Sequence, residues 1–150
     1  MNSFIDIRYN IFTEKEIINF LFYFYQNEKR HSKYNKTVTL PLEDSHKHFL
    51  MKKYEPFIAN NIIDWAQIVK WPQGAGQDYH CDLASDNTTL SSITYLNHDF
   101  VGGETVFNEG TIIQASKNKT IFFTGRNIEH GVKKVLGGVR YTIATWYKLK

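Results

Sequence analysis

The sequence has too few cysteines and too short apolar runs for two large classes of protein. Its only cysteine, Cys81, cannot form an internal disulfide, so a reducing compartment is expected. No apolar run approaches the ~20 residues that a membrane-spanning helix needs. The opening residues, MNSFIDIRYN, lack the basic and apolar regions of a secretion signal. We therefore expect a cytoplasmic protein that does not bind a membrane.

The chain also carries little excess charge. With 18 Lys and Arg against 15 Asp and Glu, its formal net charge is +3, which is too small to indicate a nucleic-acid partner. A composition of 42% hydrophobic and 22% charged residues is too apolar for a disordered chain. The length of 150 residues predicts a single domain over 1–150, and we expect a monomer.

The N-terminal part of the sequence has helical patterns. Thr13 and Glu16 have the Ser/Thr-x-x-Glu spacing of a capping box, which predicts a helix start after a short strand over Phe4–Tyr9. The stretch Gln26–Thr37 is polar, basic and without periodicity, which predicts an exposed loop. A second helical pattern follows, and Pro56 is expected to kink or split it.

From residue 64 onward, short β-branched and aromatic runs are separated by glycine and asparagine. This pattern predicts two segments of one domain, with 1–63 as helical support and 64–150 as the β core. The fold class is therefore α+β, mainly β, with a sandwich or barrel. The expected strands are Trp65–Trp71, Tyr79–Leu83, Leu90–Leu96, Glu104–Phe107, Thr111–Gln114, Thr120–Thr124, His130–Val135 and Arg140–Lys148.

Three residues have the chemistry of a metal site. His80 and Asp82 lie two residues apart in an expected strand, so their side chains point to the same face and Cys81 points to the other. A His-x-Asp pair alone is often only a hydrogen-bonded pair. His130 opens a second expected strand, and two histidines with one carboxylate form the facial triad that leaves open positions on Fe(II).

The remaining histidines lack such a pattern. His46 and His48 fall on different faces of an expected helix, and we expect both to be solvated. His98 and Asp99 lie in a turn, and His31 lies in the basic stretch. None of them is predicted to bind a metal.

Arg140 begins the last expected strand, ten residues after His130. A buried guanidinium offers a fork of donors that matches a carboxylate at two points. Thr142 shares its face by alternation and adds a hydroxyl group. Taken alone, Arg140 could be a surface residue at the end of a hairpin, but next to a metal triad it indicates a carboxylate-binding residue.

Taken together, the sequence resembles the Fe(II)/2-oxoglutarate-dependent dioxygenases of the prolyl 4-hydroxylase type. The resemblance covers about Trp65 to Tyr147, and the family fold is a double-stranded β-helix, or jelly roll, with helices on the outer face of the major sheet. The residues that carry it are His80-Cys81-Asp82, Ile93-Thr94-Tyr95-Leu96-Asn97, Gly102-Gly103-Glu104-Thr105-Val106-Phe107, His130, Arg140-Tyr141 and Trp146-Tyr147.

The resemblance implies a role for each matching position. His80, Asp82 and His130 would bind Fe(II), and Arg140 would pair with the distal carboxylate of 2-oxoglutarate. Tyr95 stands where the family often places a hydroxyl on that carboxylate, although it could equally be a core aromatic. The implied reaction hydroxylates an unactivated C–H bond and releases succinate and CO₂, with ascorbate as a further candidate cofactor.

The substrate is less well indicated. Thr88, Gln77 and Trp71 stand where the family usually has an arginine and two tyrosines, whereas Trp146 matches a family tryptophan at the substrate end or packs in the core. The stretch Gln26–Thr37 lies where the family has a mobile loop that closes over a bound peptide.

Three functions stay open at this point. The first is a prolyl 4-hydroxylase-like enzyme acting on a protein or peptide. The second has the same chemistry on a free amino acid or another small metabolite. The third is a non-catalytic jelly-roll binding module. The related nucleic-acid demethylases are set aside, because Thr142, Ala144 and Trp146 replace the residues that those enzymes carry after the arginine.

Overall fold

A computed structural model of the chain describes residues 4–83 and 85–150. Its N-terminal elements are β1 (Ile5–Tyr9), α1 (Glu14–Gln26), a 3-10 turn (Glu28–Arg30), β2 (Ser32–Tyr34), β3 (Thr37–Pro41), α2 (Asp44–Tyr54) and a second 3-10 turn (Glu55–Phe57). The strands that follow are β4 (Asn61–Trp71), β5 (Gln77–His80), β6 (Leu90–Tyr95), β7 (Val101–Gly102), β8 (Thr105–Phe107), β9 (Ile112–Ile113), β10 (Lys119–Phe123), β11 (His130–Val132), β12 (Val135–Gly137) and β13 (Arg140–Leu149).

The predicted capping box starts α1. The Glu16 backbone N–H donates to Thr13 Oγ1 at 3.1 Å, and the Thr13 N–H donates to Glu16 Oε1 at 2.8 Å. Both bonds satisfy donors that a helix start leaves without partners. Pro56 lies in the 3-10 turn that follows α2, so the second helical pattern is split there as predicted.

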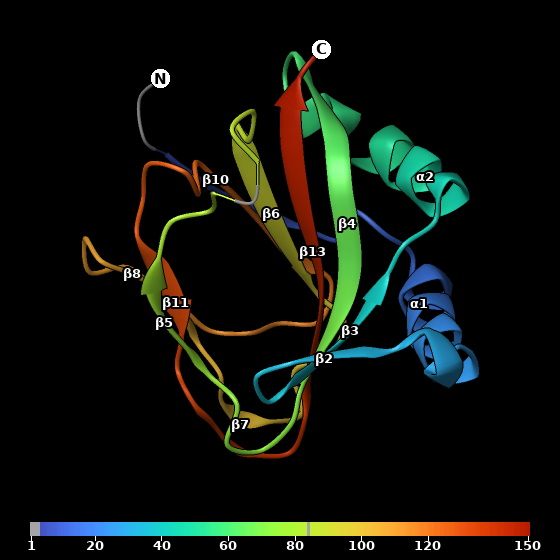
Figure 1. Cartoon of the computed structure of the whole chain (residues 1–150), viewed down its shortest axis with the longest axis vertical. Helices are drawn as coiled ribbons and strands as arrows, with labels where there is room; N and C mark the ends of the chain where they lie inside the picture. The colour runs from blue at the N-terminus through green and yellow to red at the C-terminus, as the bar shows by residue number, and fades with distance from the viewer. Residues whose placement is uncertain (1–3, 84) are drawn as a thin grey trace.

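Two antiparallel sheets face each other in the molecule (Figure 1). The major sheet has the order β1-β10-β6-β13-β4-β3-β2, and the minor sheet has the order β5-β11-β8-β9. β12 and β7 pair separately. The arrangement is the predicted jelly roll, and α1 and α2 lie on the outer side of the major sheet (Figure 1).

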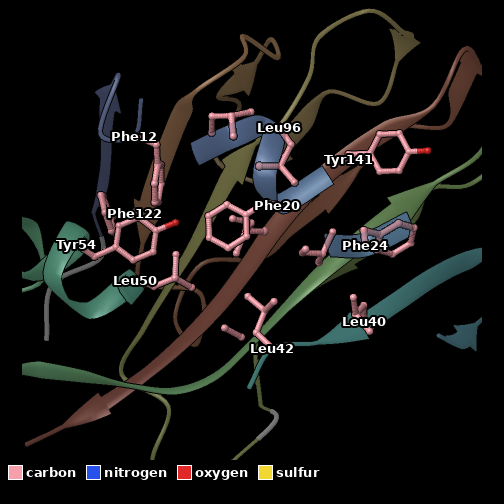
Figure 2. Packing of buried hydrophobic residues seen from close by; sticks show 14 of the residues in the cluster. Phe12, Phe20, Phe24, Leu40, Leu42, Leu50, Tyr54, Leu96, Phe122 and Tyr141 are labelled. Atoms are coloured by element: carbon pink, nitrogen blue, oxygen red, sulfur yellow. The ribbon is translucent and has the colours of Figure 1, made fainter. Parts of the chain in front are cut away.

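The largest apolar cluster joins these helices to the major sheet. Phe20 and Phe24 of α1 and Tyr54 of α2 pack with Phe122 of β10 and Tyr141 of β13 (Figure 2). Burial of such side chains contributes roughly 1.5–3 kcal/mol each to folding. No helix of the described residues is long and apolar enough to cross a membrane.

The space between the two sheets is closed at one end and open at the other. At the closed end, Arg140 of β13 and Trp71 of β4 are paired, and both are buried. Trp146 lies six residues after Arg140 on β13, and Trp65 lies six residues before Trp71 on β4, both on the same face as the closed-end pair. Trp146 is half-buried and Trp65 is 45% exposed. Because alternate residues of a strand share a face, this gradient shows that the barrel opens beside the two tryptophans.

The segment predicted as an exposed loop is instead partly folded. Within Gln26–Thr37 the structure has a 3-10 turn and β2, which forms a hairpin with β3 on β4. The region before residue 64 therefore supplies β1, β2 and β3 to the major sheet as well as the two helices. The strand expected over His130–Val135 is also divided, since β11 ends at Val132 and β12 pairs elsewhere.

Candidate metal centre

The structure brings His80, Asp82 and His130 together between the sheets. β5 pairs with β11, and His80 lies directly opposite His130 in that pairing. One ligand atom from each of the three residues lies within 4.8 Å of the others. Asp82 Oδ1 is 3.2 Å from His130 Nε2 and 3.4 Å from His80 Nε2. Two imidazoles and one carboxylate can therefore hold one cation.

The contacts that place the Asp82 side chain differ from the predicted strand alternation. β5 ends at His80, so Asp82 lies beyond the strand and its side chain is not placed by strand alternation. Its backbone N–H donates to the Gly125 carbonyl at 2.8 Å, and its Oδ2 accepts from Ser91 Oγ at 2.6 Å. Oδ1 consequently faces the two histidines while Oδ2 is held on the opposite side.

Both histidines are oriented for metal binding through Nε2. His80 Nδ1 lies 3.0 Å from the Asp78 carbonyl, and His130 Nδ1 lies 2.8 Å from the Ile128 carbonyl. A carbonyl can only accept, so a neutral ring would carry its proton on Nδ1 and leave its Nε2 lone pair free for a metal ion held between the two rings and Asp82. This is the arrangement in which metal-bound histidines are usually found, so the donor set fits a divalent transition metal.

The charge state of Asp82 also suits a cation. The side chain is 9% exposed, and burial alone would raise its pKa. In the metal-free protein, hydrogen bonds to the carboxylate from His130 and His80 outweigh that effect and hold the pKa of Asp82 below its ordinary value. The same contact with Asp82 raises the pKa of His80. The carboxylate is thus ionised at neutral pH and available as a ligand.

A small cavity of about 60 Å³ adjoins the three residues. Phe123 lines it and packs its ring 4.7 Å from that of His130, and Phe107 lies next to both rings, 5.3 Å from Phe123 and 6.2 Å from His130. Besides the triad and Phe123, the lining residues are Ser91, Ser92, Ile93, Ala144, Thr145 and Trp146. The apolar members of this lining, Phe123, Ile93, Ala144 and Trp146, lower the local polarity and strengthen electrostatic interactions there.

Arg140 is buried at the closed end of the same space, with 1% of its surface exposed. Its Nε donates to the Gly103 carbonyl at 2.9 Å and its Nη2 to Thr105 Oγ1 at 3.1 Å. The guanidinium lies over the rings of Trp71, at 4.9 Å, and Tyr95, at 5.3 Å. Burial lowers the pKa of Arg140, but an arginine stays charged in proteins.

No carboxylate among residues 4–83 and 85–150 forms a salt bridge with Arg140. A buried charge without a counter-charge is costly, so this position calls for an anionic ligand. Thr105, which binds the guanidinium, pairs with Val132, two residues along β11 from His130. Two strand residues span roughly 6.6 Å, a separation that a short dicarboxylate can bridge.

Tyr95 and Thr142 lie at this end as well. Both are buried, and they are direct partners in the pairing of β6 with β13. The Tyr95 hydroxyl shares a hydrogen bond with Thr105 Oγ1, the same oxygen that accepts from Arg140. The Tyr95 hydroxyl is thus linked to the Arg140 guanidinium through Thr105, and Thr142 lies two residues from Arg140 on the same face of β13.

The four residues proposed for the substrate side occupy different places. Trp146 lines the cavity beside the triad, as expected for that role. Trp71 instead lies against Arg140 at the closed end. Gln77 lines an exterior groove with Asn35 and other residues, and Thr88 is buried beside a separate surface cavity. The hairpin tip, to which Asn35 belongs, borders this groove rather than the cavity of the triad.

The other histidines lie outside the centre, but His46 differs from its prediction. It is half-buried rather than fully solvated: its ring packs 4.3 Å from that of Tyr23, and burial lowers its pKa. His31 stacks on Phe24 at 4.1 Å, and His48 is exposed. The His98 Nδ1 accepts from the Lys117 backbone N–H at 2.8 Å.

Two residues that hold Asp82 were not predicted from the sequence. Ser91 lies four residues before Tyr95 on β6, so strand alternation places it on the inner face. Gly125 follows β10, and a Cβ built there would lie 2.4 Å from Asp82 Oδ2 and 2.6 Å from Ser91 Oγ. The alternation was a usable signal for Ser91, whereas only the tertiary structure reveals the need for glycine.

Comparisons with known proteins identify the family of the chain. The sequence profile of the 2OG-Fe(II) oxygenase superfamily matches residues 66–148. Prolyl 3-hydroxylase 2 of Gallus gallus is 38% identical over 66 residues, which are 39% of this chain and 10% of that protein. The chain thus spans about a tenth of the length of the curated relatives it matches.

Solved structures show the same fold over nearly the whole chain. A Pseudomonas putida prolyl-4-hydroxylase has a TM-score of 0.80 at 11% identity, covering 99% of this chain and 94% of that one. A Trichoplax adhaerens prolyl hydroxylase, in complex with a hypoxia inducible factor peptide fragment, has a TM-score of 0.73 at 18% identity, covering 96% and 83%. Because the profile spans more than half of the sequence, the chain belongs to the 2OG-Fe(II) oxygenase superfamily, the enzyme family that the sequence resembled.

Proposed function

We propose that the chain is an Fe(II)- and 2-oxoglutarate-dependent hydroxylase that acts on prolyl residues of a peptide or protein and releases succinate and CO₂. One observation carries this proposal: the ligand atoms of His80, Asp82 and His130 converge beside a buried Arg140 that lacks a carboxylate partner among the described residues. A metal and a dicarboxylate together would satisfy both features.

The chain's own residues have distinct tasks in such a reaction. The bound Fe(II) and 2-oxoglutarate would supply the oxidising chemistry. His80, Asp82 and His130 would hold the metal on one side and leave its other positions open. Arg140, with Thr142 and Tyr95 beside it, would fix the distal carboxylate. Phe123 and the other apolar residues of the lining would limit the access of water once substrate is bound, which protects a reactive site from side reactions.

A peptide is favoured as substrate by the proteins that share this fold, since several are prolyl hydroxylases and one is in complex with a peptide fragment. A free amino acid or other small metabolite is a second candidate, and the small cavity of about 60 Å³ favours it. A non-catalytic module would be expected to lose part of the site, yet the triad and Arg140 are both present.

The experiment that tests the function measures succinate released from 2-oxoglutarate with Fe(II) and O₂. Peptides and free amino acids are then compared as substrates by mass spectrometry, with the gain of one oxygen atom as the readout. Succinate formation that does not depend on Fe(II) would contradict the proposal. The cytoplasmic location, the monomeric state and the use of ascorbate stay predictions.

Replacing Arg140 with alanine is expected to raise the 2-oxoglutarate concentration needed for half-maximal turnover. A charge-assisted contact contributes about 1.5–3 kcal/mol, which corresponds to roughly a 10- to 150-fold weaker affinity. Mn(II) affinity, measured without 2-oxoglutarate, should remain close to that of the wild type. Unchanged 2-oxoglutarate affinity in the variant would mean that Arg140 has only a structural role.

Replacing Ser91 with alanine should weaken metal binding, because Asp82 Oδ2 loses its hydrogen-bond donor and the carboxylate can rotate. Partners of metal ligands typically contribute about 10- to 100-fold in metal affinity. We expect a Kd for Mn(II) that is raised within this range, as measured by calorimetry. The variant Ser91→Thr keeps the hydroxyl group and should recover most of the affinity, whereas a purely steric role would give the opposite order.

A further inference from the structure

Trp65 stands at the open end of the barrel, outside the small cavity of the metal centre. It is 45% exposed and pairs directly with Trp146 across β4 and β13. Side chains of directly paired residues lie on the same face with Cβ atoms about 4.5–5.5 Å apart. Trp146 in turn lines the cavity beside His80 and Asp82. The two indoles therefore continue the inner face of the sheet from the metal centre to the solvent.

A hydrogen bond to a neighbour on the same strand face orients the Trp65 side chain. Its indole N–H donates to Gln67 Oε1 at 3.4 Å, and Gln67 is the next residue on the same face toward the closed end. The charged neighbours on these strands, Asp64 and Lys148, pair with each other at 3.5 Å. The surface beside the two indoles is therefore aromatic and carries no unpaired charge from these neighbours.

We propose that Trp65 and Trp146 together form a two-tryptophan shelf that binds an uncharged, proline-rich peptide segment in extended conformation. This role of the two indoles rests on the proposed function. The indoles would bind the part of the substrate that flanks the target prolyl residue. Proline-rich segments bind to aromatic-lined grooves because their extended helix is preformed and their rings pack on aromatic faces. Trp65 is then a specificity-determining residue.

The shelf distinguishes a peptide from a small metabolite. Trp65 does not line the cavity of about 60 Å³, whereas Trp146 does. A ligand that fits within the cavity has no contact with Trp65. A ligand that also contacts Trp65 must extend out of the cavity along the inner face of the sheet, as a peptide segment beyond the target residue would.

The experiment measures peptide binding by calorimetry in the 150-residue chain loaded with Mn(II) and 2-oxoglutarate, without O₂. The probes are an oligoproline peptide and a single blocked proline, and the variants are Trp65→Ala, Trp65→Phe and the exposed control Phe22→Ala on α1. For oligoproline we expect a Kd about 3- to 10-fold higher in Trp65→Ala than in the wild type. This fold-change corresponds to the free energy of one aromatic contact. Trp65→Phe should recover most of the affinity, and Phe22→Ala should match the wild type.

For the blocked proline we expect the same affinity in the wild type and in Trp65→Ala. An equal loss for both probes would show that Trp65 acts through the metal cavity and would overturn the shelf. Equal oligoproline affinity in the wild type and in Trp65→Ala, or no oligoproline binding to the wild type, would also overturn it. Fe(II)-dependent succinate release tests the proposed function separately, so the two failures are distinguishable.

Discussion

Replacing Asp82 with alanine should abolish Fe(II)-dependent turnover and reduce metal binding below detection. Among the residues that the structure describes, the variant loses the only carboxylate whose oxygen lies near both Nε2 atoms, 3.2 Å from His130 and 3.4 Å from His80. Two neutral imidazoles remain, and they supply no negative charge to balance a divalent cation. Calorimetric titration with Mn(II) and succinate release in the presence of Fe(II) are the two measurements.

The fold should survive this substitution. Asp82 lies outside the large core clusters, and its partners are Ser91 and the two histidines. Loss of these hydrogen bonds should lower the free energy of unfolding by about 1–3 kcal/mol, as measured by denaturant unfolding of the metal-free protein. The neighbouring variant Cys81→Ser is the matched control, and it should retain both metal binding and turnover. Wild-type turnover in Asp82→Ala would remove the assignment of the site.

The metal centre was predictable because its signal is chemical and short-range. His80 and Asp82 are two residues apart, and few residue types other than histidine and carboxylate bind such a metal. The physical reason given for their convergence was nevertheless wrong. Alternation along one strand does not orient Asp82, because the strand ends at His80. The Asp82 backbone N–H is instead held by the Gly125 carbonyl.

The hairpin of β2 and β3 shows where sequence patterns fail. All three residues of β2, Ser32–Tyr34, are exposed, so the strand has no buried face and its sequence has no apolar alternation. Only its backbone pairing with β3 makes it a strand. His46 is a similar case, because its contact with Tyr23 depends on how α2 packs against α1. Neither packing nor edge pairing is encoded in a local pattern.

Replacing Gly125 with alanine should weaken metal binding severely, although Gly125 is not itself a ligand. The new methyl group would lie 2.4 Å from Asp82 Oδ2 and 2.6 Å from Ser91 Oγ, far inside van der Waals contact. The ring of Phe123 at 3.0 Å blocks a third direction. The carboxylate would have to move away from Ser91, and Oδ1 would leave the position that faces the histidines.

We expect metal affinity in Gly125→Ala to fall by about 100-fold or more, at the upper end of the effect of ligand-supporting residues. Overpacking should lower stability by about 1–3 kcal/mol, which is too little to unfold an ordinary domain. The control is Gly137→Ala, because nothing lies within 4 Å of its added Cβ. Calorimetry with Mn(II) separates the two variants, and wild-type affinity in Gly125→Ala would show that Asp82 can bind the metal without its contact to Ser91.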